Sequence, residues 1–376
     1  MNILLRKTLS LLTPVILLFC TALVVQSCYV GRFFWWNFAD LNDYRKFPAL
    51  SVEKAGDIAE LPYHPVDSIK LPDEYDPQGT LSLNSFLRDH ETVAYLIIKN
   101  DTLIFENYFD DYTAGSIVPS FSVSKVFVSA LTGIAIGDGY IEEVKEPVSK
   151  YVPIPDDPGY REITLENLLN MRSGLDFEEA YKTPFASMPK YYYGRHLKRY
   201  IRKLEVTEEP GTRYEYMSVN TLLLSLALEK ATGMKITEYM EEKIWKPLGM
   251  EYDATWSIDS KKSNTVKSFC CLNARARDFA RFGLLYLNRG NWNGHQVIPA
   301  GWVERSTTVM NDSRDSQGYH YTYQWRVAEG RGYFAKGLLG QYIMVFPSEN
   351  AVVVRLGRKY ADIDWFGFTG QLLEEL

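Results

Sequence analysis

Strand-forming segments lie at both ends of the folded part of this chain, and that placement limits the folds open to it. Residues 92–98 and 102–108 alternate apolar and polar side chains on either side of Asn100-Asp101, which predicts a β-hairpin. A strand needs partners for its backbone groups, so we expect the hairpin to pair with the strand patterns that return much later in the chain. Those patterns lie at 321–327, 341–346 and 351–356.

Helical patterns fill the region between these strands. An apolar helix is predicted to begin near Ser122 and to fade at Gly137. This order predicts an α+β fold, with an antiparallel sheet lobe built from the N- and C-terminal segments and an inserted helical lobe. Small molecules tend to bind in a cleft between such lobes. Further helices are predicted at 164–171, 221–232, 237–246, 275–288 and 365–376.

The composition excludes several classes of protein. The 41 Lys and Arg residues stand against 47 Asp and Glu, and a net charge of -6 argues against a nucleic-acid binder. A mean hydropathy of -0.21 excludes a polytopic membrane protein. Five His and four Cys form no zinc-binding pattern, so we expect neither metal nor cofactor. Cys270 and Cys271 are neighbours in the chain, and we do not expect them to bridge each other.

The N-terminus is typical of a targeting segment. Arg6 and Lys7 precede an apolar run over 9–25, the n-region and h-region of a secretory signal. Residues 1–28 are predicted to be a signal peptide or a membrane anchor, and the four residues ending at Cys28 resemble a relaxed bacterial lipobox. Either alternative tethers the folded part to a membrane, facing the periplasm or cell exterior. The remaining alternative is a buried helix of a cytosolic protein.

The segment after Cys28 carries little sign of regular structure. Residues 29–80 contain several prolines and little periodicity, so they are predicted to be a linker and N-terminal extension. The aromatic cluster over 33–36 would suit a membrane–water interface. Residues 81–376 are then predicted to form the folded domain.

A serine followed three residues later by a lysine is a candidate nucleophile with its base. The pattern occurs at three places, which are Ser51/Lys54, Ser187/Lys190 and Ser122/Lys125. The first lies in the predicted linker, and Pro189 within the second disfavours a helix there. The third opens the predicted apolar helix, so we favour it.

The spacing of Ser122 and Lys125 at a helix start is suited to a nucleophile and its base. On a helix the two side chains share a face, one turn apart. A serine at a helix start lies near unpaired N–H groups, and its own N–H could bind an oxyanion. Apolar neighbours would partly desolvate Lys125, which favours the neutral amine that can accept a proton. The alternative is a capping serine beside a solvated lysine.

Two further segments could face the same cleft. Tyr216 follows a Pro-Gly turn and precedes a helix, where it could face a cleft or simply pack in the core. Residues 337–340 precede an apolar strand, and their glycines would let a substrate lie along the strand edge or would form an ordinary bend.

Taken in order, these segments resemble the serine β-lactamase and penicillin-binding-protein superfamily. The resemblance is to its class C-like branch of esterases and 6-aminohexanoate-dimer hydrolases, and it spans roughly residues 80–370. The segments that carry it are Ser122–Lys125, Asn167–Leu175, Pro210–Asn220, Ala274–Gly283 and Gly337–Gly340.

The resemblance implies a β-lactamase/transpeptidase-like fold and a catalytic role for each matching residue. Ser122 would be the acylated nucleophile, Lys125 its base, and Tyr216 the residue that relays a proton to the leaving group. The N–H groups of Ser122 and Leu338 would form the oxyanion hole. No metal or cofactor is implied.

The resemblance also implies substrate-binding positions, which are Ser218, Gly337, Leu338 and Tyr181. Ser218 stands where the superfamily motif Tyr-x-Asn has its asparagine, as it does in the 6-aminohexanoate branch. A tyrosine at the place of Tyr181 contacts substrate in that branch, and a surface loop is the alternative there.

One departure from the superfamily concerns charge. The Lys-Thr-Gly triplet begins with Ala335 here, so the cation that helps hold the carboxylate of a β-lactam or peptide is missing. Lys336 is shifted by one residue, which on a strand points it to the opposite face. Three other cations could take over the carboxylate, namely Arg326, Arg355 and Arg358.

The sequence therefore predicts a serine hydrolase that cleaves a small-molecule ester or amide through an acyl-enzyme on Ser122. The missing cation favours neutral short-chain esters over β-lactams. One alternative is a D,D-peptidase or β-lactamase that acts on peptidoglycan-like or β-lactam substrates. The other is a non-catalytic, membrane-tethered sensor that binds a ligand in the same cleft.

Overall fold

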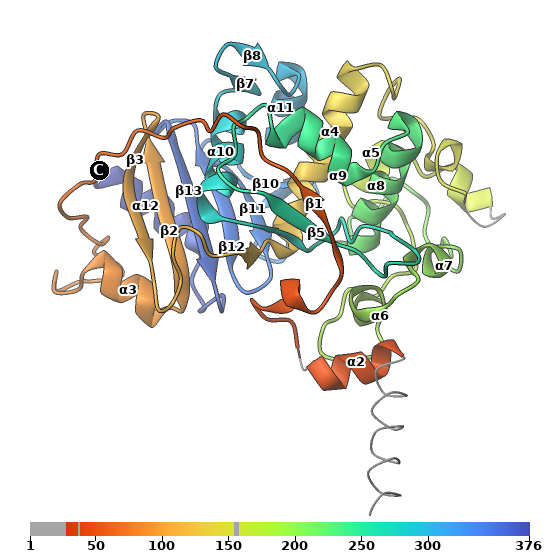
Figure 1. Cartoon of the computed structure of the whole chain (residues 1–376), viewed down its shortest axis with the longest axis horizontal. Helices are drawn as coiled ribbons and strands as arrows, with labels where there is room; N and C mark the ends of the chain where they lie inside the picture. The colour runs from red at the N-terminus through yellow and green to blue at the C-terminus, as the bar shows by residue number, and fades with distance from the viewer. Residues whose placement is uncertain (1–27, 37, 154–157) are drawn as a thin grey trace, which may run out of the picture.

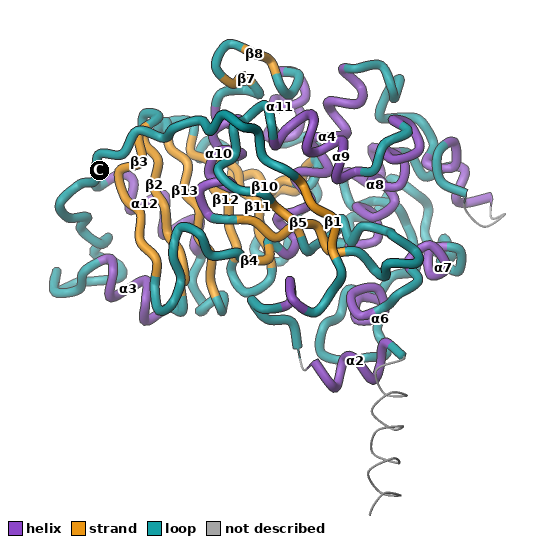
Figure 2. The backbone as a smooth tube through the Cα atoms, viewed as in Figure 1, coloured by secondary structure: helices purple, strands orange, loops and turns teal. Residues whose placement is uncertain are grey.

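A computed structural model describes residues 28–36, 38–153 and 158–376, and it has the predicted α+β architecture of a sheet lobe beside a helical lobe (Figures 1 and 2). The strands are β1 (Ala49–Val52), β2 (Thr92–Lys99), β3 (Thr102–Tyr108), β4 (Val118–Pro119), β5 (Ala254–Ser257), β6 (Leu272–Ala274), β7 (Asn291–Trp292), β8 (His295–Gln296), β9 (His320–Thr322), β10 (Trp325–Ala328), β11 (Gly332–Gly337), β12 (Gln341–Phe346) and β13 (Ala351–Gly357). The helices are α2 (Tyr29–Trp36), α3 (Leu83–Asp89), α4 (Ser124–Gly137), α5 (Leu165–Leu169), α6 (Ser187–Tyr193), α7 (Leu197–Ile201), α8 (Ser218–Thr232), α9 (Ile236–Met240), α10 (Ala276–Leu287), α11 (Ala300–Thr307) and α12 (Trp365–Glu374).

The main sheet joins the two ends of the domain, as predicted. Its order within the described residues is β3-β2-β13-β12-β11-β10-β9, and every neighbouring pair is antiparallel. Strand β13 pairs with the early hairpin on one side and with β12 on the other, so that Val353 lies opposite both Ile97 and Met344. Figure 1 shows the orange hairpin beside the blue C-terminal strands.

Alternate residues of β13 serve two separate hydrophobic layers. Val353 belongs to the layer that α3 and α12 cover, whereas Val352 and Val354 belong to the larger core beneath α10. This two-sided burial explains the continuous apolar run of the strand. The sheet is thus covered on both faces, and the larger core continues into the helical lobe.

The helical lobe is built around α4, which packs against α8, α9 and α11. Every residue of α4 from Ser124 to Ala135 is buried. A helix that is apolar on all sides is a core helix, which fits its place between the sheet lobe and the other helices. Helix α8 ends where the predicted helix over 221–232 does, and Gly233, with a φ of 73°, forms its left-handed C-cap.

The predicted strand over 321–327 is wrong in one respect, because it is two strands. Tyr323 and Gln324 both adopt left-handed backbone conformations and form the turn between β9 and β10. The Gln324 side chain donates to the carbonyls of Leu168 and Leu169 and accepts from Thr221. Tertiary contacts with the helical lobe therefore hold a turn that the local pattern does not signal.

Two other expectations also need correction. Ser187 and Lys190 do lie on a helix, α6, because Pro189 falls in its first turn, where the missing N–H costs no hydrogen bond. Cys270 and Cys271 do form a disulfide with each other. Cys271 has a φ of 68°, a left-handed conformation that local sequence reasoning does not anticipate.

Much of the segment 29–80 lies against the domain. Helix α2 packs on α6, and β1 pairs with β5 in a second sheet of order β1-β5-β6-β4. The main chain near residue 64 also bonds to β3 through His64 and Leu103. The N-terminal extension therefore packs against both lobes. The predicted targeting run over 9–25 lies outside the described residues.

We predict that Gly133→Ala destabilises the protein, although alanine is the better helix former. An added Cβ at Gly133 would collide with the indole of Trp302 on α11. Overpacking of this kind costs about 1–3 kcal/mol, against about 1 kcal/mol of gained helix propensity. Thermal unfolding measures the change. Gly301→Ala is the matched control, because nothing lies within 4 Å of its added Cβ. An equal or higher melting temperature for Gly133→Ala would contradict the packing argument.

Candidate active site

Ser122 lies in a tight turn that runs directly into α4. A 3-10 turn spans Phe121–Val123, and the α-helix begins two residues after the serine. The preceding residue, Phe121, has a φ of 45°, which is a left-handed conformation for a bulky side chain. Strain of this kind persists only where the surroundings enforce it, and it is concentrated at functional sites. The side chain of Ser122 is half-buried and lines a cavity.

Lys125 is buried directly beside this serine. Its Nζ donates to Ser122 Oγ at 2.9 Å, to Ser218 Oγ at 3.2 Å and to the Phe269 carbonyl at 2.8 Å. These three acceptors satisfy an ammonium group completely. When Nζ is neutral, the same 2.9 Å separation lets the Ser122 hydroxyl donate its proton to the amine. The structure thus brings together the predicted nucleophile and base.

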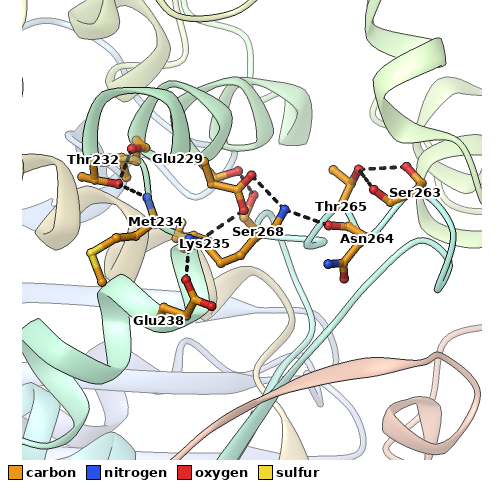
Figure 3. A network of polar contacts seen from close by, with 12 residues as sticks. Glu229, Thr232, Met234, Lys235, Glu238, Ser263, Asn264, Thr265 and Ser268 are labelled. Carbon is orange, nitrogen blue, oxygen red and sulfur yellow. Dashed lines mark hydrogen bonds and ion pairs between the residues drawn. The ribbon is translucent and has the colours of Figure 1, made fainter.

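The loop that supplies the Phe269 carbonyl is held by α4, α8 and α9. Ser124 Oγ donates to the Ser268 carbonyl, and Ser268 Oγ lies 2.6 Å from Ser225 Oγ on α8. Lys235, just before α9, bonds to the Asn264 carbonyl and pairs with Glu229 (Figure 3). These contacts fix the position of the acceptor beside Lys125.

Ser218 connects Lys125 to a carboxylate that sequence reasoning missed. Glu179 accepts from the Ser218 N–H and from its hydroxyl, each at 2.7 Å. It also accepts from the Tyr181 hydroxyl at 2.6 Å. Burial and the Glu179 charge raise the pKa of Tyr181, so its hydroxyl stays protonated and donates. The carboxylate lies at the N-terminus of α8, where the helix dipole favours negative charge. The signal available in the sequence was its place two residues before Tyr181.

Tyr216 lines the same cavity, between two cations. Lys125 Nζ lies 5.0 Å from the centre of its ring, and the Arg326 guanidinium lies 5.6 Å from it. Both are within the range of cation–π attraction. The ring of Tyr321 packs against it edge-on. The tyrosine is thereby held next to the predicted base.

The end of β11 approaches the nucleophile closely. A Cβ at Gly337 would collide with the Ser120 carbonyl and crowd Phe121, so only glycine permits this approach. Ser122, Gly337 and Leu338 consequently line one cavity. This arrangement is compatible with the predicted oxyanion hole, which needs the N–H groups of Ser122 and Leu338 to face a common point.

The cavity carries two cations although the triplet lysine is missing. Ala335 is buried in the core, and Arg326 from the neighbouring strand β10 lines the cavity. The expectation that Lys336 points to the opposite face is wrong, because Lys336, near the end of β11, also lines the cavity. Arg326 pairs with Asp315 at 2.6 Å. Burial and the charge of Arg326 lower the pKa of Lys336 to about 8.

The other two arginines considered have structural roles. Arg355 is buried and donates to the backbone carbonyls of Gly340 and His90, whereas Arg358 pairs with Asp110. Of the three candidates, only Arg326 therefore lines the cavity.

The cavity has a volume of about 370 Å³ and is largely aromatic. Among the described residues, no group of three or more His, Cys, Asp or Glu side chains is placed to hold a metal ion. The chemistry available there is that of a serine, a lysine and a tyrosine. The aromatic residues that line it are Phe38, Phe121, Tyr181, Tyr192, Tyr193, Tyr216 and Tyr360.

Comparisons with known proteins agree with this geometry. A family model described as Beta-lactamase matches residues 85–361. The 6-aminohexanoate-dimer hydrolase of Paenarthrobacter ureafaciens is 26% identical over 363 residues, covering 90% of this chain and 89% of its own. The D-alanyl-D-alanine-carboxypeptidase/endopeptidase AmpH of Escherichia coli K12 is 26% identical over 181 residues, 44% of this chain and 45% of its own. A solved structure from Bacillus anthracis, provisionally named a 6-aminohexanoate-dimer hydrolase, has a TM-score of 0.75 at 21% identity and covers 90% of this chain and 91% of its own.

We predict that Ser122→Ala abolishes covalent labelling by a fluorophosphonate and lowers hydrolysis by about 10³-fold or more. The other hydroxyl bonded to Lys125, that of Ser218, donates to Glu179 and does not line the cavity, so it cannot replace Ser122. Mass spectrometry of the labelled protein measures the first effect. Ser187→Ala is the matched control, since that serine shares the sequence pattern but does not line the cavity. Labelling of the Ser122 variant at the parental level would refute the assignment.

We predict that Glu179→Gln lowers kcat by about tenfold to a hundredfold. The amide removes the charge that holds Ser218, and a charge-assisted hydrogen bond contributes roughly 1.5–3 kcal/mol. Steady-state kinetics with a nitrophenyl ester measures the loss. The neighbouring Glu178 side chain is exposed, so Glu178→Gln should retain parental activity. Equal activity in both variants would show that the carboxylate has no part in the reaction.

Proposed function

The chain belongs to the Beta-lactamase family and is a serine hydrolase, and we propose that it cleaves a small linear amide or ester through an acyl-enzyme on Ser122. The observation that carries the proposal is the 2.9 Å contact between Lys125 Nζ and Ser122 Oγ at the wall of the aromatic cavity. Membership of a hydrolase family sets aside the alternative of a non-catalytic sensor.

The proposed reaction is based on the positions of the side chains. Neutral Lys125 accepts the Ser122 proton as Oγ attacks the substrate carbonyl carbon, and the N–H groups of Ser122 and Leu338 bind the oxyanion. Tyr216 relays a proton to the leaving nitrogen or oxygen, and the bond to the carbonyl carbon breaks. Water then attacks the acyl-enzyme, so that the acid is released and the Ser122 hydroxyl is restored.

The cations in the cavity support a substrate that carries a carboxylate. Arg326 and Lys336 both line the cavity, although Arg326 is already paired with Asp315. The relative from Paenarthrobacter ureafaciens is named for a linear amide substrate, and most of its length aligns with this chain. We therefore extend the proposal to linear amides with an anionic end, which revises the expectation that recognition of a carboxylate is weakened.

The same two cations favour a second candidate function. A peptide that ends in D-alanine also carries a carboxylate, and the partial match to AmpH covers part of this domain. A carboxypeptidase activity on peptidoglycan-like peptides, or β-lactam hydrolysis, would use the same serine. The two functions differ in the substrate that is turned over fastest.

We predict that the KM for a carboxylate-bearing linear amide rises as the pH increases through about 8, while the KM for nitrophenyl acetate does not. The Lys336 ammonium is present below this pKa and is lost above it, so attraction to the carboxylate weakens at high pH. Lys336→Gln should remove the difference between the two substrates. Lys359→Gln is the control, because that lysine is exposed and pairs with Glu91.

The outcomes of this experiment separate the candidates. A ratio of the two KM values that is independent of pH and of Lys336 would exclude carboxylate binding by this side chain. Faster turnover of a cephalosporin or a D-alanyl-D-alanine peptide than of either test substrate would replace the proposal with the second candidate.

We also propose that the N-terminus tethers the domain to a membrane, with the active site facing the periplasm or cell exterior. The support is the sequence pattern alone, namely Arg6 and Lys7, the apolar run over 9–25, and Cys28. No helix among the described residues is both long and apolar enough to span a bilayer.

We predict that the full chain fractionates with membranes and that Cys28→Ser changes its processing or releases it if the cysteine is lipidated. Ser27→Ala is the neighbouring control. Membrane retention of the Cys28 variant at the parental size would instead identify an uncleaved anchor. A parent chain found wholly in the cytosolic fraction would exclude both forms of tether.

A further inference from the structure

Four large aromatic side chains are exposed at one end of the helical lobe. Phe34 and Trp35 on α2 are 66% and 59% exposed, Phe38 is 55% exposed, and Phe185 is 81% exposed. We call these four residues the aromatic face. Isolated exposed apolar residues are ordinary, but a group of this size marks an interaction surface.

The aromatic face has a rigid base. Phe33 is buried, and its ring contacts Phe34, Phe38 and Tyr193, with centroid distances of 5.4, 5.9 and 5.8 Å. Arg32 donates to the Tyr193 carbonyl and further attaches α2 to α6. Figure 1 shows α2 against α6 at the lower edge of the molecule. The rings of Phe34 and Phe38 thus rest on a packed layer behind them.

The aromatic face borders the active-site cavity. Phe38 lines the cavity itself, and Phe185 belongs to the short loop between the cavity-lining residues Lys182 and Met188. A molecule bound to this face would therefore be adjacent to the opening that leads to Ser122.

A cationic run begins beside the aromatic residues of α6 and continues along the chain. Residues 190–204 contain six Lys and Arg side chains and no Asp or Glu, although the chain as a whole has a net charge of -6. Arg195 lies close enough to Arg32 for its charge to contribute, after burial, to lowering the pKa of Arg32. None of the six has a salt bridge within the described part of the chain. The six are Lys190, Arg195, Lys198, Arg199, Arg202 and Lys203.

The short separation in sequence between the aromatic face and the N-terminal apolar run indicates what this face binds. Helix α2 begins at Tyr29, only four residues after the apolar run over 9–25 ends. Aromatic rings are favoured at the headgroup level of a bilayer, and lysines and arginines are attracted to anionic lipids. A tether at residue 28 would hold both features within reach of the membrane surface.

From these observations we propose that the aromatic face docks on an anionic lipid bilayer and that the enzyme takes an amphiphilic ester or amide from that surface. The proposal rests on the proposed hydrolase activity, and it extends the proposed tether from the N-terminus to the folded domain. An acyl chain that leaves the bilayer beside Phe38 enters the aromatic cavity without crossing water, which is the physical advantage of the arrangement.

The test uses the full chain with vesicles of phosphatidylglycerol or of phosphatidylcholine. The substrates are nitrophenyl palmitate in the vesicles and nitrophenyl acetate in solution. The variant Phe34→Ser/Trp35→Ser/Phe185→Ser should lose about tenfold or more of its palmitate rate and keep its acetate rate, because none of the three residues lines the cavity. The matched control replaces three aromatic or apolar residues that are exposed elsewhere, Tyr63→Ser/Tyr140→Ser/Met310→Ser, and should keep both rates.

Deuterium exchange gives a second readout that does not depend on catalysis. On phosphatidylglycerol vesicles, the segments 29–36 and 181–189 should be protected in the parent and not in the aromatic variant. A parental ratio of palmitate to acetate turnover in the aromatic variant, or absence of this protection in the parent, would overturn the docking proposal. A change in oligomeric mass of the aromatic variant without vesicles would point instead to a second copy of the chain as the occupant and would also overturn it.

Failure of the proposed tether or of the proposed hydrolase activity would give results that differ from a failure of docking. A chain that does not float with phosphatidylcholine vesicles lacks the tether, but docking still predicts flotation with phosphatidylglycerol vesicles that added salt reverses. A chain that hydrolyses neither ester lacks the proposed activity, and the exchange measurement then decides docking by itself.

Discussion

The buried amine of Lys125 is the constraint on which the arrangement of the active site depends. An ammonium group out of water is costly unless each of its protons has an acceptor, and here the three acceptors come from three parts of the chain. Ser122 comes from the turn before α4, Ser218 from the start of α8, and the Phe269 carbonyl from the loop before β6. The helices and the loop must therefore be held in register for the lysine to be stable inside the protein.

The carboxylate of Glu179 accepts a hydrogen bond from Ser218, which is one of the three acceptors of Lys125. It fixes Ser218 through both the N–H and the hydroxyl, and it lies at the positive end of α8. The hydrogen bonds from Glu179 through Ser218 to Lys125 are suited to positioning the proposed base rather than to contacting substrate. The cavity-lining Tyr181 also donates to the Glu179 carboxylate. One acceptor therefore holds both a side chain of the cavity and the serine that contacts Lys125.

Charge and aromatic surface together define what the cavity can accept. Arg326 and Lys336 supply positive charge from β10 and β11, and seven aromatic side chains contribute to the rest of the lining. The N-terminal extension adds Phe38 to this lining and places α2 beside it. A segment outside the region matched by the family model thus contributes to the lining of the cavity.

Local pattern was sufficient for the elements whose residues set their own conformation. The hairpin at β2 and β3, the buried helix α4, the cap at Gly233 and the Ser122–Lys125 spacing are all explained by periodicity, turn residues and the geometry of one helical turn.

Positions that depend on distant partners could not be predicted from the local sequence pattern. The turn at Tyr323–Gln324 is held by the helical lobe, the Cys270–Cys271 bond needs a left-handed residue, and Arg326 reaches the cavity only because β10 lies beside β11. The sequence by itself determined the fold class, and it placed the proposed nucleophile one helical turn from its proposed base, since both inferences rest on patterns within short segments. Only the tertiary structure decided that Arg326 and Phe38 line one cavity and that Glu179 holds Ser218 beside Lys125, because packing between segments far apart in the chain sets which side chains share a space.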